Sequence, residues 1–314
     1  NKGWEISVSG VPVKVKNFEW KTIFNWSKNN SMVESLPEGI DKIQIGSGVY
    51  NVKSYAEVGK PYGAIYAKTF KRDAEGYILC QLDGSPKEGQ DYEYLGCVQA
   101  DWRGGWNNVF RLGNFSFSVM FDFQKGGKFF SQTSIQSSVD GQSVKSLEGR
   151  DADFFSRKIL GESDEERYGF MRPQNANTPT ANGQIYPDWG RPKGVVLPNC
   201  RYDEDVEGLA GQQVLGYCTP ERYWMHYTSR DISRFIYDAS YVKLREITVS
   251  YDLPKKWLRK TPFQTFRVAA VGRNIATLFA NTPHGLDPQA TSTTGNAQGF
   301  ERGFNLPSAT YGFD

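Results

Sequence analysis

Runs of residues with period two, each close to the length of a membrane strand, constrain this sequence most. From Phe115 to Phe123 every second residue is Phe or Val, and the residues between them are Ser, Met and Asp. Successive side chains of a strand point to opposite faces, so this run predicts one ring-rich, apolar face and one polar face. A tilted strand needs about 9 to 11 residues to cross a bilayer. The run therefore has the pattern and the length of a membrane-spanning strand.

Seven runs of this kind can be placed along the chain. We predict strands at about residues 3–12, 17–29, 104–112, 114–125, 239–253, 265–279 and 309–314. Gly113 and Asn114 are the turn residues of a hairpin, and Pro254 ends the fifth strand because proline cannot donate to a sheet ladder. Seven strands cannot close alone, so we expect an all-β fold in which they form part of a larger, even-stranded, antiparallel transmembrane barrel.

The connections between these strands alternate between short and long. The long segments are residues 30–103, 126–238 and 280–308. Outer-membrane barrels have short periplasmic turns and longer extracellular loops. We therefore expect the three long segments to be extracellular loops, and the last strand to leave the C-terminus on the periplasmic side.

Composition fits a barrel but leaves an alternative open. Aromatic residues make up 14% of the chain, whereas the mean hydropathy is -0.56 and only 39% of residues are hydrophobic. A barrel with a polar lumen and wet loops has this balance, and so does a soluble or surface-anchored β-sandwich that binds glycans or adheres to partners. Sandwich turns recur every 8 to 12 residues or so, which does not fit these long connections. A passive porin would fit the strands equally well.

Other function classes have little support in the sequence. The 37 basic and 35 acidic residues form no long run of like charge, so no nucleic-acid partner is predicted. No stretch approaches 18 apolar residues, which excludes a transmembrane helix, and Asn1-Lys2-Gly3-Trp4 is not a signal peptide. Two histidines and no Gly-x-Ser-x-Gly pattern provide no obvious nucleophile and base, so we do not expect an enzyme.

Short motifs follow one another along nearly the whole chain, apart from about residues 132–235. Near the N-terminus they are Asn1-Lys2-Gly3-Trp4-Glu5-Ile6, Asn17-Phe18-Glu19-Trp20 and Phe24-Asn25-Trp26-Ser27-Lys28-Asn29. Near the C-terminus they are Tyr241-Val242-Lys243-Leu244-Arg245, Gly272-Arg273-Asn274, Gly285-Leu286-Asp287-Pro288 and Leu306-Pro307-Ser308. In this order they resemble the C-terminal part of the SusC/RagA family of TonB-dependent outer-membrane transporters found in Bacteroidetes.

The resemblance implies more than the residues themselves show. Family members are 22-stranded barrels filled by an N-terminal plug, and TonB pulls on that plug. The plug domain is absent from this chain. A SusD-like surface lipoprotein covers the barrel as a lid, and glycans or oligopeptides are the usual cargo. The resemblance therefore implies an integral outer-membrane importer, in contact with lipid and lipopolysaccharide, whose remaining strands and plug lie outside this chain.

Aromatic and arginine residues in the long connections are candidates for cargo contact. Rings can stack on sugar faces or apolar side chains, and arginines can donate hydrogen bonds. The candidates are Trp102, Arg103, Trp106, Tyr217, Arg222, Tyr223 and Trp224. The alternative is that these rings pack the loops together, contact the lid or anchor at the membrane interface.

Cysteines and acidic clusters suggest two further sites. Cys80 with Cys97, and Cys200 with Cys218, are close pairs that could form local disulfides, although four unpaired thiols fit equally well. Their spacing matches no zinc pattern, so no metal site is predicted from them. No cofactor is expected, apart from calcium at Asp203-Glu204-Asp205 or at residues 162–166, where the alternative is a solvated loop.

Overall fold

A computed structural model describes residues 1–147, 195–218, 220–283, 285–289, 298–303 and 308–313. Seven strands form one antiparallel sheet in the order β1-β2-β8-β9-β14-β15-β17. Their bounds are β1 Lys2–Val15, β2 Phe18–Asn30, β8 Trp102–Leu112, β9 Phe115–Lys125, β14 Tyr241–Asp252, β15 Arg267–Ala280 and β17 Thr310–Phe313. Each strand overlaps a range expected from the sequence. Among the described residues, β1 and β17 each pair on one side, so this sheet is open.

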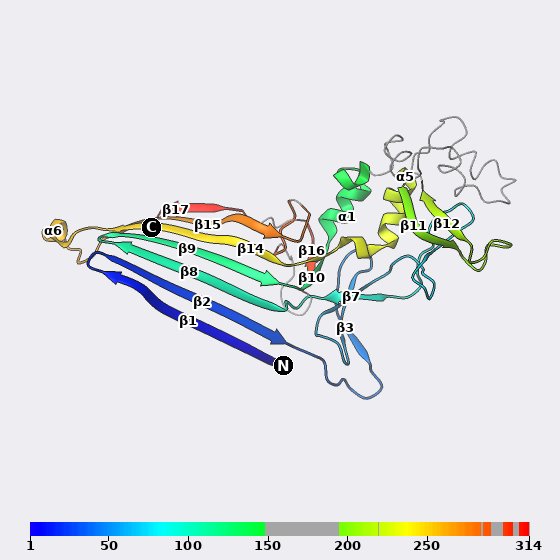
Figure 1. Cartoon of the computed structure of the whole chain (residues 1–314), viewed down its shortest axis with the longest axis horizontal. Coiled ribbons are helices and arrows are strands. Elements are labelled where there is room, and N and C mark those ends of the chain that lie inside the picture. Colours follow the sequence, from blue (N-terminus) through cyan, green and yellow to red (C-terminus); the bar gives the residue numbers. More distant parts are fainter. Residues whose placement is uncertain (148–194, 219, 284, 290–297, 304–307, 314) are drawn as a thin grey trace.

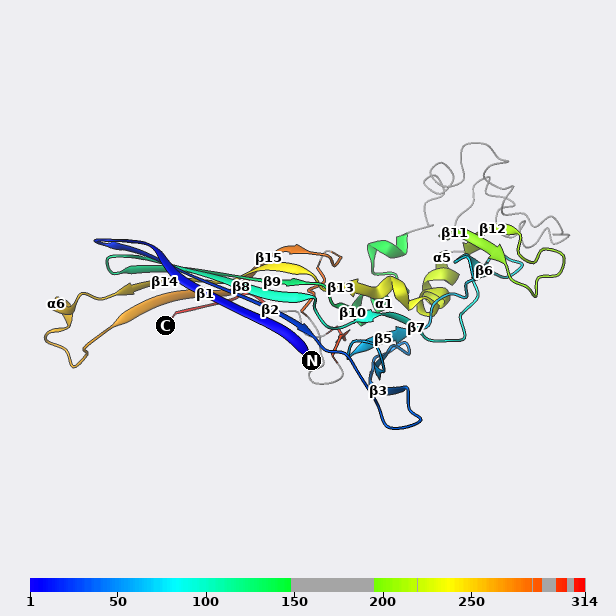
Figure 2. The ribbon, with the colours of Figure 1, turned by 60° about the horizontal axis from the view of Figure 1, so that its bottom comes forward.

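The seven-stranded sheet is long and curved, and its connections differ at its two ends. Figure 1 shows the tight turns and the short helix α6 (Lys255–Leu258) at one end, and the long connections gathered at the other. Figure 2 shows the same division from a second direction, with the twisted strands on one side of the view. We call the described parts of the long connections, residues 31–101, 126–240 and 281–309, the cap.

One face of the sheet carries the rings. Trp20 stacks on Phe110, and Phe110 stacks on Phe117, with centroids 5.9 and 6.1 Å apart. These residues are register partners across β2, β8 and β9, as the alternation of side chains requires. Trp4 on the same face is 72% exposed. We call this the ring-bearing face, and the opposite face, which carries Ser118 and its neighbours, the polar face.

Two polar side chains interrupt the ring-bearing face, and each accepts a hydrogen bond from an indole. Thr22 and Asn108 lie opposite each other on β2 and β8. The indole N–H of Trp106 donates to Thr22 Oγ1 at 2.9 Å, and that of Trp20 donates to Asn108 Oδ1 at 3.1 Å. Both tryptophan donors are therefore satisfied within the chain, which is what a face directed at lipid requires.

The cap contains small sheets of its own. A four-stranded antiparallel sheet has the order β3-β4-β5-β7, and two three-stranded sheets have the orders β12-β11-β6 and β13-β10-β16. The bounds are β3 Lys42–Ser47, β4 Lys53–Glu57, β5 Ala64–Ala67, β6 Ile78–Cys80, β7 Glu93–Cys97, β10 Lys128–Ser131, β11 Val195–Tyr202, β12 Gln213–Cys218, β13 Ile236–Asp238 and β16 Phe300–Glu301. These strands lie within segments that the sequence analysis treated as loops.

Short helices complete the cap and help to enclose its core. They are α1 Gln132–Val139, η1 Val144–Leu147, α5 Pro220–Arg222, η3 Tyr223–Tyr227, η4 Thr228–Arg230 and η5 Ile232–Phe235. The buried apolar side chains form two clusters, one around Trp224 and one around Phe130. Most of the fully buried side chains of the chain lie in the cap. Within the described ranges, no helix is long and apolar enough to cross a membrane.

Candidate functional site

A cluster of charged and amide side chains lies on the polar face where the seven-stranded sheet meets the cap. Arg103 comes from β8, Asp122 and Gln124 from β9, and Tyr241 and Lys243 from β14. The register brings them together, because Gln124 lies opposite both Arg103 and Tyr241, and Asp122 lies opposite Lys243. Since opposite residues share a face, the strands alone are enough to assemble this group.

A bulge in β14 adds Arg245 to this cluster. The register of β14 shifts between Leu244 and Glu246 against both of its neighbours, which leaves Arg245 as an extra residue. Bulges of this kind re-aim a side chain. The Arg245 guanidinium binds the Asp122 carboxylate and also donates to Asn274 Oδ1 at 2.5 Å. The bulge therefore places a third cation beside the two strand residues Arg103 and Lys243.

The segment after β15 closes one side of the cluster. Lys243 Nζ donates to both carboxylate oxygens of Asp287 at 2.6 Å, and to Gln289 Oε1 at 3.0 Å. Gln289 also accepts from Arg245 at 2.7 Å and donates to the Tyr241 hydroxyl at 2.5 Å. The Lys243 side chain is 5% exposed, and a buried ammonium is stable only when it is paired in this way. The cluster is thus a rigid wall.

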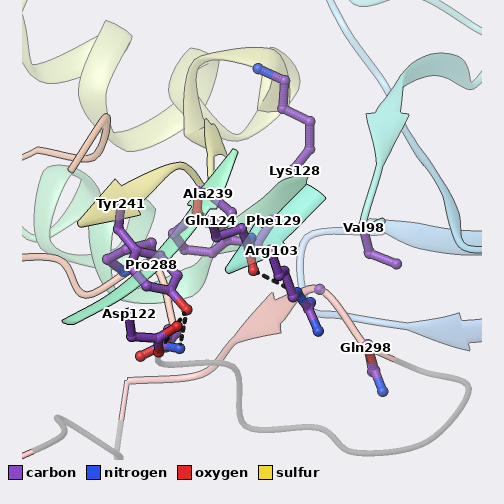
Figure 3. Close-up of a pocket in the computed structure, with 12 residues that line it drawn as sticks. Val98, Arg103, Asp122, Gln124, Lys128, Phe129, Ala239, Tyr241, Pro288 and Gln298 are labelled. Carbon is purple, nitrogen blue, oxygen red and sulfur yellow. Dashed lines mark hydrogen bonds between the residues drawn. The ribbon is translucent and has the colours of Figure 1, made fainter. Parts of the chain in front are cut away.

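A cavity of about 390 Å³ lies against this wall. Arg103, Asp122, Gln124 and Tyr241 line it from the sheet, and Lys128 lines it from the cap (Figure 3). Arg103 Nε donates to Gln124 Oε1 at 2.9 Å, and Figure 3 shows this bond at the edge of the cavity. The lining therefore presents charges of both signs together with amide and hydroxyl groups.

Arg103 also lines two neighbouring cavities. One, of about 290 Å³, includes Trp102 and Gln99, and the other, of about 650 Å³, includes Ser7 and Asn25 on the polar face of β1 and β2. The Arg103 side chain is exposed and so remains accessible from these hollows. An exposed guanidinium held by a neighbouring amide can bind a carboxylate through two parallel hydrogen bonds.

The chain is similar in sequence to curated TonB-dependent receptors. It is 23% identical, over 99% of its length, to TonB-dependent receptor P3 of Formosa agariphila. It is 21% identical, over 41% of its length, to TonB-dependent receptor P39 of the same organism. The matches cover 27% and 17% of these two proteins. No family model matches the chain.

Solved structures of a peptide transporter, RagAB, share the fold. One structure of that transporter matches 98% of this chain and 28% of its own chain, with a TM-score of 0.53 and 13% identity. The same importer in a closed-closed state matches 95% of this chain and 28% of its own, with a TM-score of 0.54 and 14% identity. The chain is thus similar to TonB-dependent receptors along nearly its whole length and shares the fold of the corresponding part of the RagAB transporter. Such receptors are outer-membrane proteins, and this segment spans a little over a quarter of the relatives' length.

The candidate residues of β8 separate onto different faces of the sheet. Arg103 lies on the polar face and Trp102 lines a cavity beside it. Trp106 lies on the ring-bearing face, where it stacks on Phe121 with the ring centroids 6.0 Å apart. Trp102 has the same parity as Trp106, and its ring makes an edge contact with Phe123 on the ring-bearing face, with the centroids 6.2 Å apart, so of these three residues Arg103 is the one on the polar face. The expectation that Trp106 contacts cargo is corrected, because its ring points to the opposite side of the sheet from the cavities.

The candidates from the second long connection lie within the cap. Tyr223 is 0% exposed and Trp224 is 1% exposed, and the two rings make an edge contact at 5.1 Å. Their burial corrects the expectation of cargo contact, because these side chains offer no surface. Arg222 donates to Asp83 at 2.8 Å and to the Tyr227 hydroxyl at 3.0 Å. Tyr217 lies in β12.

Of the two alternatives for the cysteines, local disulfides or thiols, the structure contains thiols. Cys97 lies in β7, and its sulfur donates to Tyr62 O at 3.4 Å and accepts from Gln99 N at 3.3 Å. Cys80 lies in a different sheet and shares a thiol hydrogen bond with Cys200. The pairing of Cys80 with Cys97 is therefore corrected, because strand order separates these residues.

The acidic cluster at residues 203–205 binds lysines. The Asp203 carboxylate accepts from Lys71 at 2.9 Å and from Lys87 at 2.7 Å, and Lys87 also binds Asp205. Burial opposes ionisation of Asp203, but the two lysine hydrogen bonds outweigh it and lower its pKa to about 2. Among the described residues, no group of acidic, cysteine or histidine side chains is arranged for a metal. The other calcium candidate, residues 162–166, lies outside the described residues.

Several residues of the cluster were missed by sequence reasoning. Asp122 was recognised only as part of the polar half of an alternating strand, and Gln124 was not singled out. The position of Arg245 could have been predicted from the charges around it. Lys243, Arg245 and Glu246 cannot all lie on the polar face of a regular strand, because neighbouring residues point to opposite faces. That conflict predicts a bulge. Gln289 had no signal, because only the fold brings it to β14.

Proposed function

We propose that this segment forms part of the wall and the extracellular vestibule of an outer-membrane, TonB-dependent importer. The ring-bearing face contacts lipid, the polar face lines the lumen, and the cap lies outside the cell, with the C-terminal strand running toward the periplasm. The observation that carries the proposal is the position of the cavities, which lie against the polar face at the cap end of the sheet. Cargo that enters between cap and wall meets Arg103 there.

The two faces of the sheet support this orientation. Stacked rings with satisfied indole donors suit a hydrocarbon environment, in which an unpaired donor is costly. The charged pairs of the sheet lie on the other face, for example Arg245 with Asp122 and Arg273 with Glu246. A porin would share this arrangement. The likeness to TonB-dependent receptors supports an importer instead.

The cavity chemistry favours oligopeptides over glycans as cargo. A peptide carries an ammonium, a carboxylate and repeating amides, and the lining offers the guanidinium of Arg103, the carboxylate of Asp122 and the amide of Gln124. Sugar recognition by stacking needs an exposed ring, but of the described rings in this lining Tyr241 is 3% exposed and Phe129 is 1% exposed. The fold likeness to a peptide transporter supports the same cargo class.

The proposed importer needs partners that lie outside this chain. The missing strands pair with the open edges at β1 and β17, where backbone groups facing lipid would otherwise have no partner. A plug fills the barrel and transmits the pull of TonB. A SusD-like lipoprotein covers the cap as a lid, an assignment supported by the resemblance of the sequence to the SusC/RagA family and by the fold likeness to the RagAB transporter.

Replacement of Arg103 tests the cargo assignment. The intact receptor complex is incubated with a tryptic digest of casein, and bound peptides are counted by mass spectrometry. Arg103→Ala should lower peptide retention about tenfold, which corresponds to one charge-assisted hydrogen bond. The control is Arg111→Ala, an exposed arginine at the far end of β8, which should retain peptides normally. Equal retention by both variants, or retention of glycans alone, would contradict the assignment.

A further inference from the structure

Two cysteines from different long connections meet in the cap. Cys80 is the last residue of β6, which belongs to the connection that joins β2 to β8. Cys200 lies in β11, which belongs to the connection that joins β9 to β14. β6 and β11 pair in parallel, with Cys80 opposite Tyr202 and Ile78 opposite Cys200. Residues two apart in a strand share a face, so both thiols lie on the same face of this three-stranded sheet.

Burial and contact single out this pair among the cysteines. Cys80 is 0% exposed and Cys200 is 1% exposed, and both belong to the apolar cluster around Trp224. Their thiols are hydrogen-bonded to each other. β6 is a three-residue strand that pairs with β11 on one side and bridges Arg72 and Pro86 on the other, so the backbone holds Cys80 in a fixed place beside β11.

Ion pairs hold the same two connections together beside the cysteines. Lys71 and Lys87 from the first connection bind Asp203 from the second at 2.9 and 2.7 Å. Arg201, the neighbour of Cys200, binds Asp73 at 3.0 Å. These contacts do not depend on the cysteines. They keep the thiols adjacent and so raise the effective concentration of one thiol at the other.

We propose that Cys80 and Cys200 form a disulfide that links the two long connections of the cap. Disulfides form and persist in the bacterial periplasm and on cell surfaces. Because the cap reaches that environment through the proposed outer-membrane location, this inference rests on the proposed function. The bridge closes a long loop that contains β7, β8 and β9, and a longer closed loop restricts the unfolded chain more.

The reaction is thiol–disulfide exchange with an oxidised periplasmic dithiol oxidoreductase. Both thiols are buried in the folded cap, so the exchange takes place while the cap folds, when the Cys200 thiolate attacks the disulfide of the oxidant, breaks that bond and forms a mixed disulfide. The Cys80 thiolate then attacks the Cys200 sulfur and releases the oxidant as a dithiol. Two electrons and two protons pass from the cysteines to the oxidant.

The test is peptide mapping of the receptor isolated from outer membranes with an alkylating agent present and no reductant. Trypsin separates the four cysteines, because Cys80 falls in residues 73–87, Cys97 in 88–103, Cys200 in 194–201 and Cys218 in 202–222. We expect residues 73–87 and 194–201 in one species, two hydrogens lighter than their sum, and an alkylated Cys97.

Variants complete the test. Cys80→Ser and Cys200→Ser should each abolish the linked species, whereas Cys97→Ser and Cys218→Ser should retain it. Alkylated Cys80 and Cys200, or a link between Cys200 and Cys218, would overturn the proposal. The same sample is tested for a co-purifying polypeptide that contains the plug. If the plug is present but Cys80 and Cys200 are not linked, the disulfide proposal fails while the importer proposal stands.

Discussion

At the residue scale, Asp203 is the side chain on which two long connections converge. Its carboxylate is 3% exposed and is held by Lys71 and Lys87. A buried carboxylate is stable in this position because both lysines donate to it, and the net effect is a pKa of about 2. Since the ordinary aspartate pKa is about 3.9, ionised Asp203 stabilises the folded cap by about 2 kcal/mol.

Asp203→Asn should therefore destabilise the cap at neutral pH. The folded-state pKa is lowered, so the stabilisation is present above about pH 4 and is lost as the pH falls toward 2. Hydrogen exchange across residues 200–213 should be faster in the variant than in the parent at pH 7, and the difference should shrink toward pH 2. Asp205→Asn is the control, since that side chain is 69% exposed. A difference that persists unchanged at pH 2 would contradict the ion-pair account.

The face of the sheet on which a side chain lies was predictable from the sequence only in regular strands, where odd-numbered and even-numbered residues point to opposite faces. Parity distinguishes Arg103 from Trp106, which lie three positions apart on opposite faces of β8. It gives no information about Tyr223 and Trp224, because they belong to short irregular helices. Their burial depends on packing against β6, β11 and β12, which no local pattern records.

At the scale of elements, β9 shows how one strand divides two environments. Val119 and Ser118 are neighbours near the middle of β9, and they point to the ring-bearing and polar faces. If the ring-bearing face contacts hydrocarbon, a charge is costly at position 119 and tolerated at position 118. The cost of a lysine on the lipid face near the bilayer midplane is about 2 to 4 kcal/mol.

A matched pair of variants tests this difference. Val119→Lys should lower the stability of the folded barrel in detergent by about 2 kcal/mol or more, whereas Ser118→Lys should change it by less than about 1 kcal/mol. Urea-dependent unfolding, followed by the mobility shift of folded barrels on gels, measures both. Equal destabilisation by the two lysines would show that the two faces of β9 meet the same environment.

The long strands were predictable because each alternates over many residues, whereas the cap strands were not. In β6, for example, all three residues from Ile78 to Cys80 are buried, so the strand has no polar face and shows no alternation of polar and apolar residues. Pairings such as β6 with β11 join segments far apart in sequence. The bulge at Arg245 was detectable in principle, because charged residues there violate the alternation of β14.

At the scale of the whole molecule, the seven-stranded sheet and the cap perform different tasks. The sheet has few buried side chains of its own, and every residue of β1 is exposed. The cap has an apolar core and many ion pairs, as expected for a body in water. This division explains why the chain is rich in rings yet polar on average, and it leaves the sheet dependent on lipid and on further strands.

The most direct test of the importer account is to isolate the protein from outer membranes in mild detergent and identify everything that co-purifies by mass spectrometry. We predict that the chain requires detergent and appears with a plug-containing portion and a SusD-like lipoprotein. A chain that appears alone and stays soluble without detergent would contradict the account, and a binding module built from a β-sandwich would then replace it.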